Sequence, residues 1–166
     1  MSPTFSEVPT MRLRALCLLV GAALYLVAPH QAQADCPAKP MLTIKESQNG
    51  FAGKTGTIWT IKPACSYEIS RFQGTKVSPP HLEGQLTAEQ QSQLANALAA
   101  AAVETLPARI GERAPVNSRQ ISIDYGGKTA VLNLGMGDPA LQGPLQDPAH
   151  RVVEIIKAVK SVTGDE

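Results

Sequence analysis

Two pairs of alternating stretches, each pair separated by a glycine-containing turn, most constrain how this chain folds. Residues 41–46 and 55–61 place apolar side chains at every second position, which is the pattern of a half-buried strand. Residues 121–124 and 128–134 repeat the pattern around residues 126–127, which are both glycine and form a two-residue hairpin signal. Because short turns join antiparallel neighbours, the sequence predicts a mainly antiparallel sheet made of hairpins.

Each predicted hairpin gathers its apolar side chains on one face. Residues 48–53 contain Asn and Gly, which tolerate the backbone conformations of a chain reversal. We therefore centre the first turn there, and the second on the glycine pair. The predicted cross-strand pairs are Leu42 with Trp59, Ile44 with Thr57, Ile123 with Ala130, and Ile121 with Leu132.

Outside the hairpins, residues 66–72 form a third and weaker predicted strand. Three segments with glycine, proline or asparagine are predicted to be loops, and they span residues 73–84, 109–118 and 135–148. The last loop is longer than most connections, and we interpret it as a cover over the core. It carries three apolar residues, Met136, Leu141 and Leu145.

Two amphipathic helices complete the pattern. The first begins after Thr87, because Thr87 and Gln90 suit a capping box, and it is expected to end at Pro107. Its apolar stripe is Leu94, Leu98 and Ala101. The apolar stripe of the second is Val152, Ile155, Ile156 and Val159. The order βββ-α-ββ-α predicts an α+β domain, in which a mainly antiparallel sheet of about five strands packs two α-helices on one face.

The N-terminus has the three parts of an export signal. Residues 12–14 supply two arginines, residues 15–28 an apolar core, and residues 32–34 a small-residue cleavage site. Residues 1–34 are therefore predicted to be a signal peptide, with Met11 as an alternative start. The apolar core is shorter than the ~20 residues of a membrane span. We expect an exported protein, periplasmic or secreted, with no membrane insertion after cleavage.

Removal of that signal leaves residues 35–166, a length that suits a single globular domain. The signal contains two of the 15 basic residues and one of the 14 acidic residues, so 13 of each remain. This neutral balance argues against nucleic acid, or an anionic membrane surface, as the main partner.

Two cysteines remain after cleavage, Cys36 and Cys65, which is an even number in an oxidising compartment. We expect them to form a disulfide that clamps the first hairpin at the end opposite its turn. Closing this loop would stabilise the fold by about 3 kcal/mol on a chain-entropy model. A structural bond is favoured over redox catalysis, which usually uses a C-x-x-C pair.

Side chains suited to catalysis or metal binding are few. His81 and His150 are the histidines of the mature chain, and with Glu83 they fall short of the four ligands usual in a structural zinc site. The sequence has no G-x-S-x-G nucleophile motif, and its paired glycines lie between strands instead of at a strand-to-helix phosphate turn. We predict a non-catalytic protein without cofactor or metal. A small metal-binding hydrolase is an alternative.

Several short motifs resemble the emfourin family of small protein inhibitors, and the similar layout covers nearly all of residues 35–166. A strand leads into a Gly-Phe-Ala-Gly turn, and a Leu-Thr-Ala-Glu-Gln cap opens the first helix. The matching positions are Gly50-Phe51-Ala52-Gly53, the cap from Leu86, the helix exit Leu106-Pro107-Ala108, and the hairpin Gly126-Gly127-Lys128.

This resemblance implies a domain that inhibits a thermolysin-like (M4) metallopeptidase by placing a stiff loop in its cleft. The partner-binding residues it points to are Asn49, Gly50, Phe51, Ala52 and Gly53. A large apolar side chain at a hairpin tip either folds back as a local anchor or meets a partner, and Phe51 has this position. An interaction or structural module of the cell envelope, with some other partner, is the alternative function.

Overall fold

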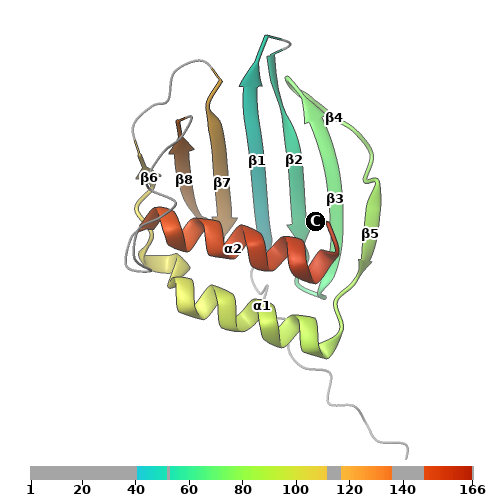
Figure 1. The fold of residues 1–166 in the computed structure, drawn as a ribbon. Helices are drawn as coiled ribbons and strands as arrows, with labels where there is room; N and C mark the ends of the chain where they lie inside the picture. The colour runs from blue at the N-terminus through green and yellow to red at the C-terminus, as the bar shows by residue number, and fades with distance from the viewer. Residues whose placement is uncertain (1–40, 52, 112–116, 136–147, 166) are drawn as a thin grey trace, which may run out of the picture. The chain divides into compact units, whose positions relative to one another are not determined.

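One sheet and two helices make up the described part of the chain. The computed structural model describes residues 41–51, 53–111, 117–135 and 148–165. Its eight described strands run in the order β4-β3-β2-β1-β7-β8-β6, and β5 also pairs with β3 (Figure 1). The strands are β1 (Leu42–Gly50), β2 (Gly53–Ile61), β3 (Ser66–Gln73), β4 (Lys76–Val77), β5 (Leu82–Gln85), β6 (Arg109–Ile110), β7 (Arg119–Tyr125) and β8 (Lys128–Leu134). The helices are α1 (Ala88–Ala101), α2 (Pro148–Thr163) and a short 3-10 helix, η1 (Val103–Thr105).

All strand pairs are antiparallel except β6 with β8, so the prediction of an α+β fold with a mainly antiparallel sheet and two α-helices is confirmed. The predicted five strands and the order βββ-α-ββ-α are wrong. The additional strands β4 and β6 lie within segments predicted to be loops, β5 extends one residue beyond such a segment, and each of the three has only two to four residues. They form by pairing with a longer neighbour, which their own sequence pattern does not reveal.

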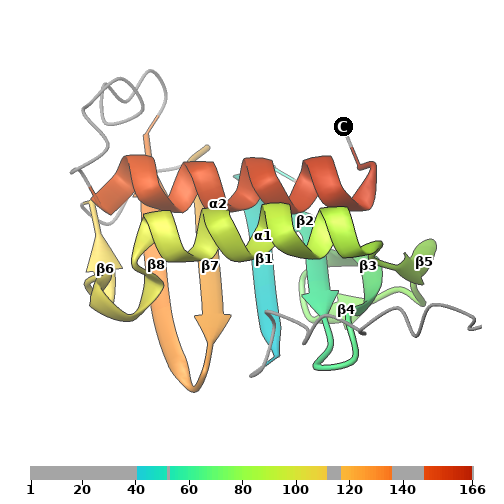
Figure 2. The same cartoon turned by 90° about the horizontal axis from the view of Figure 1, so that it is seen from below.

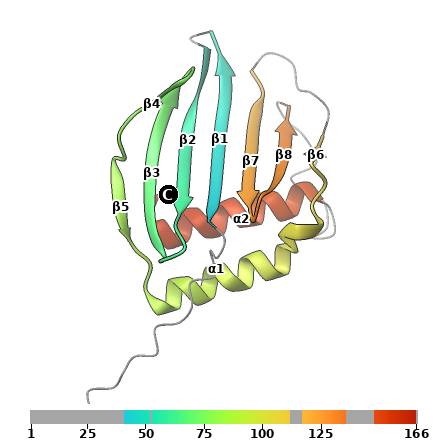
Figure 3. The same cartoon turned by 180° about the vertical axis from the view of Figure 1, so that it is seen from behind.

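Both helices share one hydrophobic core with one face of the sheet. Figures 1 and 2 show α2 crossing the strands and α1 running beside it. The predicted apolar stripes of both helices are buried. The facing strand residues include Leu42, Ile44, Trp59, Ile61, Ile69, Ile121, Ile123 and Leu132. Figure 3 shows the molecule from the other side, with the sheet face opposite the helices toward the viewer.

The two hairpin registers were predicted with different success. In the β7–β8 hairpin, Ile123 pairs with Ala130 and Ile121 with Leu132, as predicted. In the β1–β2 hairpin, Leu42 pairs with Ile61 and Ile44 with Trp59, so the predicted partners Trp59 and Thr57 are wrong. The turn lies one residue further along the chain than expected, because β1 extends to Gly50. Since each partner shifts by two residues, every side chain keeps its predicted face.

Helix α1 begins as predicted and ends early. The Thr87 hydroxyl accepts from the backbone N–H of Gln90 at 3.2 Å, and the Gln90 side chain accepts from the N–H of Thr87 at 2.8 Å, which confirms the capping box. The expected end at Pro107 is wrong, because Ala102 adopts a left-handed conformation with φ of 43°. The chain then turns through η1, which buries Val103 and Leu106.

Several predictions fall on residues outside the described ranges. These are the signal peptide at residues 1–34 with its alternative start Met11, and Cys36, Ala52, Met136, Leu141 and Leu145. Within the described ranges, neither helix is long and apolar enough to cross a bilayer.

Candidate functional site

The tip of the β1–β2 hairpin is the loop that the sequence predicts to bind a partner. Gly50 pairs with Gly53, so Phe51 and the following residue form a two-residue loop. The Phe51 side chain is fully exposed, at 105% of its reference area. Asn49, Gly50 and Gly53 are exposed as well. Phe51 therefore does not fold back as a packing anchor on the described residues.

The backbone of the tip depends on one glycine more than on the other. Gly53 has φ of +89°, a conformation that side-chain-bearing residues rarely adopt. Gly50 has no positive φ, and a Cβ there would meet no atom within 4 Å. Gly53 is thus the position whose conformational freedom the turn requires.

Hydrogen bonds to both neighbouring strands hold the base of the tip. The backbone N–H of Asn49 donates to the Ser118 carbonyl at 3.1 Å, and the N–H of Gly74 donates to the Lys54 carbonyl at 2.7 Å. The Lys54 ammonium also donates to the Gln120 side-chain oxygen at 2.7 Å. These contacts hold the two strand ends that carry the tip, and such preorganisation lowers the entropic cost of binding.

The far end of the same hairpin carries one of the two predicted disulfide cysteines. Cys65 lies in the β2–β3 connection with φ of 60°, and its side chain is buried in the core. Its N–H donates to the Lys62 carbonyl at 2.8 Å. The predicted partner Cys36 lies outside the described residues, so the Cys36 to Cys65 bridge stays a prediction.

The residues considered for a metal site do not form one. His81 is exposed and precedes β5, which contains Glu83, whereas His150 lies in the first turn of α2 and contacts Glu154 at 3.7 Å. In the described parts of the chain, no group of three or more His, Cys, Asp or Glu side chains could hold a metal ion.

The Glu46 side chain on β1 links β7 to the C-terminal end of α2. The Glu46 carboxylate forms salt bridges with Arg119 on β7 and, at 2.9 Å, with Lys160 on α2. The Lys160 ammonium lies 5.2 Å from the centre of the Trp59 ring, and the Trp59 indole N–H donates to Asp165 at 2.9 Å. These contacts fasten the last turn of α2 over the β1–β2 hairpin. We interpret this cluster as structural.

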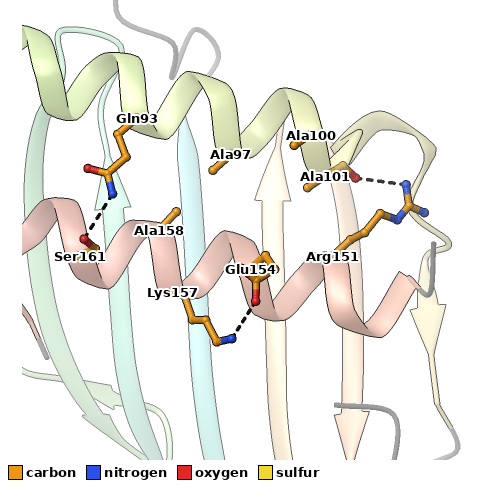
Figure 4. A pocket seen from close by; sticks show the side chains of 9 residues that line it. All are labelled: Gln93, Ala97, Ala100, Ala101, Arg151, Glu154, Lys157, Ala158 and Ser161. Carbon is orange, nitrogen blue, oxygen red and sulfur yellow. Dashed lines mark hydrogen bonds and ion pairs between the residues drawn. The ribbon is translucent and has the colours of Figure 1, made fainter. Parts of the chain in front are cut away.

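The seam between the two helices contains a shallow groove of about 420 Å³ (Figure 4). Its lining includes Ala97, Ala101 and Ala158, whose small side chains allow the helices to approach closely. At one end Gln93 donates to Ser161 at 3.4 Å. At the other end Arg151 donates to the Ala101 carbonyl at 3.1 Å, which satisfies a backbone acceptor at the end of α1. The polar groups at both ends thus serve helix packing.

Sequence reasoning missed the residues that support the tip. Ser118 and Gln120 reach it only because β7 lies beside β1, and Lys54 of β2 finds its partner Gln120 for the same reason. No local motif marks them. The alternating pattern of β7 was the one available signal, and it does not say which strand lies beside it.

Comparison of this chain with protein-family models and with curated proteins gave no match.

Proposed function

We propose that this chain is an exported, non-catalytic protein-binding domain that inserts the β1–β2 tip into a protein partner. Following the emfourin resemblance, we propose a thermolysin-like (M4) metallopeptidase as that partner. The carrying observation is the fully exposed Phe51 at the end of a braced hairpin. The binding residues would be Asn49, Gly50, Phe51, Ala52 and Gly53.

Phe51 has the properties of an interface anchor. Hot spots at protein interfaces are often aromatic side chains that enter a pocket, surrounded by weaker contacts that exclude water. Burying a phenylalanine side chain is worth about 1.5 to 3 kcal/mol. The preceding residue, Gly50, has no side chain, and the ring is fully exposed to solvent, so it is accessible to a peptidase cleft.

Titration of thermolysin with the purified protein tests this function. Peptidase activity should fall in proportion to added protein and level off near one equivalent. Phe51→Ala should weaken inhibition by about 30-fold, since a loss of about 2 kcal/mol corresponds to that factor. Inhibition constants from progress curves at several substrate concentrations would give the comparison.

Val77→Ala is the matched control, because Val77 is a second exposed apolar side chain, 57% accessible, at the edge of the same sheet. This variant should inhibit like the parent. Lack of inhibition across a panel of M4 peptidases would contradict the proposed partner. Equal inhibition by the parent and Phe51→Ala would contradict the proposed role of the tip.

A further inference from the structure

The sheet face opposite the helices carries an ordered polar pattern set by the strand register. In one ladder row Arg109, Val131, Ser122, Lys45 and Ile58 stand side by side across five strands. The next row toward the hairpin tip contains Asn133, Gln120, Ser47, Gly56 and Phe72. Lys54 follows one step further, beside the tip. Because side chains alternate along each strand, all of these lie on the face away from the helices.

Short side chains in the middle of these rows leave a hollow of about 360 Å³. Ser122 lines it, and Ser47, beside Gln120 in the next row, is buried. Gly56 must lack a side chain, because a Cβ there would lie 1.9 Å from the Glu46 carbonyl oxygen. The hollow lies within the volume range of small-ligand sites, although it opens on a sheet face.

Hydrogen-bonded side chains form one wall of the hollow. Lys54 donates to the Gln120 oxygen at 2.7 Å, and the Gln120 amide donates to the Asn133 oxygen at 2.8 Å. This relay spans β2, β7 and β8, and it holds the Lys54 ammonium beside the hollow. The Lys45 ammonium is held at another side, 4.1 Å from the centre of the buried Phe72 ring.

The charges around the hollow are all of one sign. Lys45, Lys54 and Arg109 line it, and no carboxylate does. None of these three cations forms a salt bridge with a described residue. The acidic residues Glu68 and Asp124 belong to the row on the other side of Lys45. Three cations without a salt-bridge partner among the described residues, two of them held by side-chain contacts, favour an anionic group.

We propose that this hollow binds a carboxylate side chain of the protein partner that receives the tip. The hollow adjoins the tip, since Lys54 directly follows Gly53, so a partner in contact with Phe51 can also cover the cationic face. The proposal rests on the proposed function for the source of the carboxylate, and the hollow itself can be tested without a peptidase. The partner surface should therefore be acidic beside its apolar pocket.

The probe is the peptide acetyl-Gly-Glu-Glu-Gly-amide, titrated into the ¹⁵N-labelled protein and followed by NMR. Backbone amides of Lys54, Gln120 and Asn133 should shift saturably at millimolar peptide. The peptide with glutamine in place of glutamate should give no such shift. Lys54→Gln and Arg109→Gln should each weaken binding by up to about fivefold, which is the value of a partly exposed ion pair, and together by more.

Lys157→Gln is the matched control, because it removes an exposed cation from the helix layer. It should change peptide affinity by less than about twofold. No saturable shift, or equal weakening by Lys157→Gln, would overturn the site. Free glutarate binding more tightly than the peptide would also overturn the proposal, because it would assign the hollow to a small metabolite.

The two proposals fail in different ways. Phe51→Ala should bind the peptide like the parent, because the tip does not line the hollow. Peptide binding without any peptidase inhibition would contradict the proposed function and leave the hollow intact. Inhibition that is unchanged in the Lys54→Gln Arg109→Gln double variant would contradict the role of the hollow and leave the tip intact.

Discussion

The β1–β2 hairpin ends in a fully exposed phenylalanine and the β7–β8 hairpin ends in two glycines, although both are antiparallel and close through two-residue loops. Gly126 and Gly127 have φ of 64° and 75°, as a tight hairpin turn with two left-handed residues requires. Among the described residues of the β1–β2 turn, Gly53 has a positive φ, of 89°, and it lies in β2. The β7–β8 turn therefore presents no side chain at its loop positions, whereas the β1–β2 turn presents the phenyl ring of Phe51 to solvent.

The largest effects on stability should come from substitutions in the body of the β1–β2 hairpin, such as Gly56→Ala and Trp59→Ala. Gly56→Ala places a methyl group against the Glu46 carbonyl oxygen and the Phe72 ring. Relieving that overlap must separate β1 from β2, at a cost of about 3 kcal/mol in the free energy of unfolding. Urea denaturation would measure this. Gly50→Ala, on the same hairpin but with open space around it, should change stability by less than about 0.5 kcal/mol. Equal stability of both variants would contradict the close approach at Gly56.

Two turns of similar composition were predicted with different accuracy for a physical reason. The adjacent glycines at 126–127 specify both loop positions, so they also specify the register of β7 and β8. At the first turn, Asn49 and Gly50 are turn-forming residues too, so the sequence places them in the loop. In the structure Asn49 instead bonds to Ser118 across the β1–β7 pair. Both turn-forming residues also continue the ladder with Lys54 and Gly53 of β2, and the local turn-forming pattern does not reveal this longer pairing.

The candidate sites were predictable to different degrees for the same reason. Phe51 could be named from the sequence, because an aromatic residue among turn-forming residues is conspicuous. Its exposure required the structure. The cationic hollow could not be predicted at all, since Lys45, Lys54 and Arg109 meet only when β1, β2 and β6 take their places in the sheet.

A smaller effect should follow from loosening the two hairpins from each other. Glu46 on β1 links Arg119 on β7 with Lys160 on α2, and its side chain is only 18% exposed. Glu46→Gln should lower the free energy of unfolding by about 1 to 2 kcal/mol, because the exposed Arg119 and the half-buried Lys160 lose the largely buried carboxylate that pairs with both. The difference should shrink in high salt.

Glu154→Gln is the control for that change, since Glu154 pairs with the exposed Lys157 on the surface of α2. It should cost less than about 0.5 kcal/mol. If both glutamates prove equivalent, the Glu46 cluster does not join the hairpins more firmly than an ordinary surface pair does.

Substitutions in the glycine turn of β7–β8 should change stability through backbone conformation alone. Gly127→Ala introduces no contact within 4 Å but forces an L residue into positive φ, at a cost of about 1 kcal/mol. Gly127→Asn should recover much of this loss, because asparagine tolerates the left-handed region. Thermal unfolding of the three proteins would rank them, and a ranking with Ala above Asn would contradict the left-handed turn.

The smallest effect is expected at the residue with the largest role in binding. Phe51→Ala should leave the free energy of unfolding unchanged within about 0.5 kcal/mol, because the exposed ring buries nothing on the described residues in the folded state. Trp59→Ala on β2 should instead cost about 3 to 5 kcal/mol, because Trp59 is buried in the core. Urea denaturation of both variants separates the two roles within one hairpin. A substantial loss of stability in Phe51→Ala would mean that the ring packs on its own chain, and the tip would then have no anchor to offer a partner.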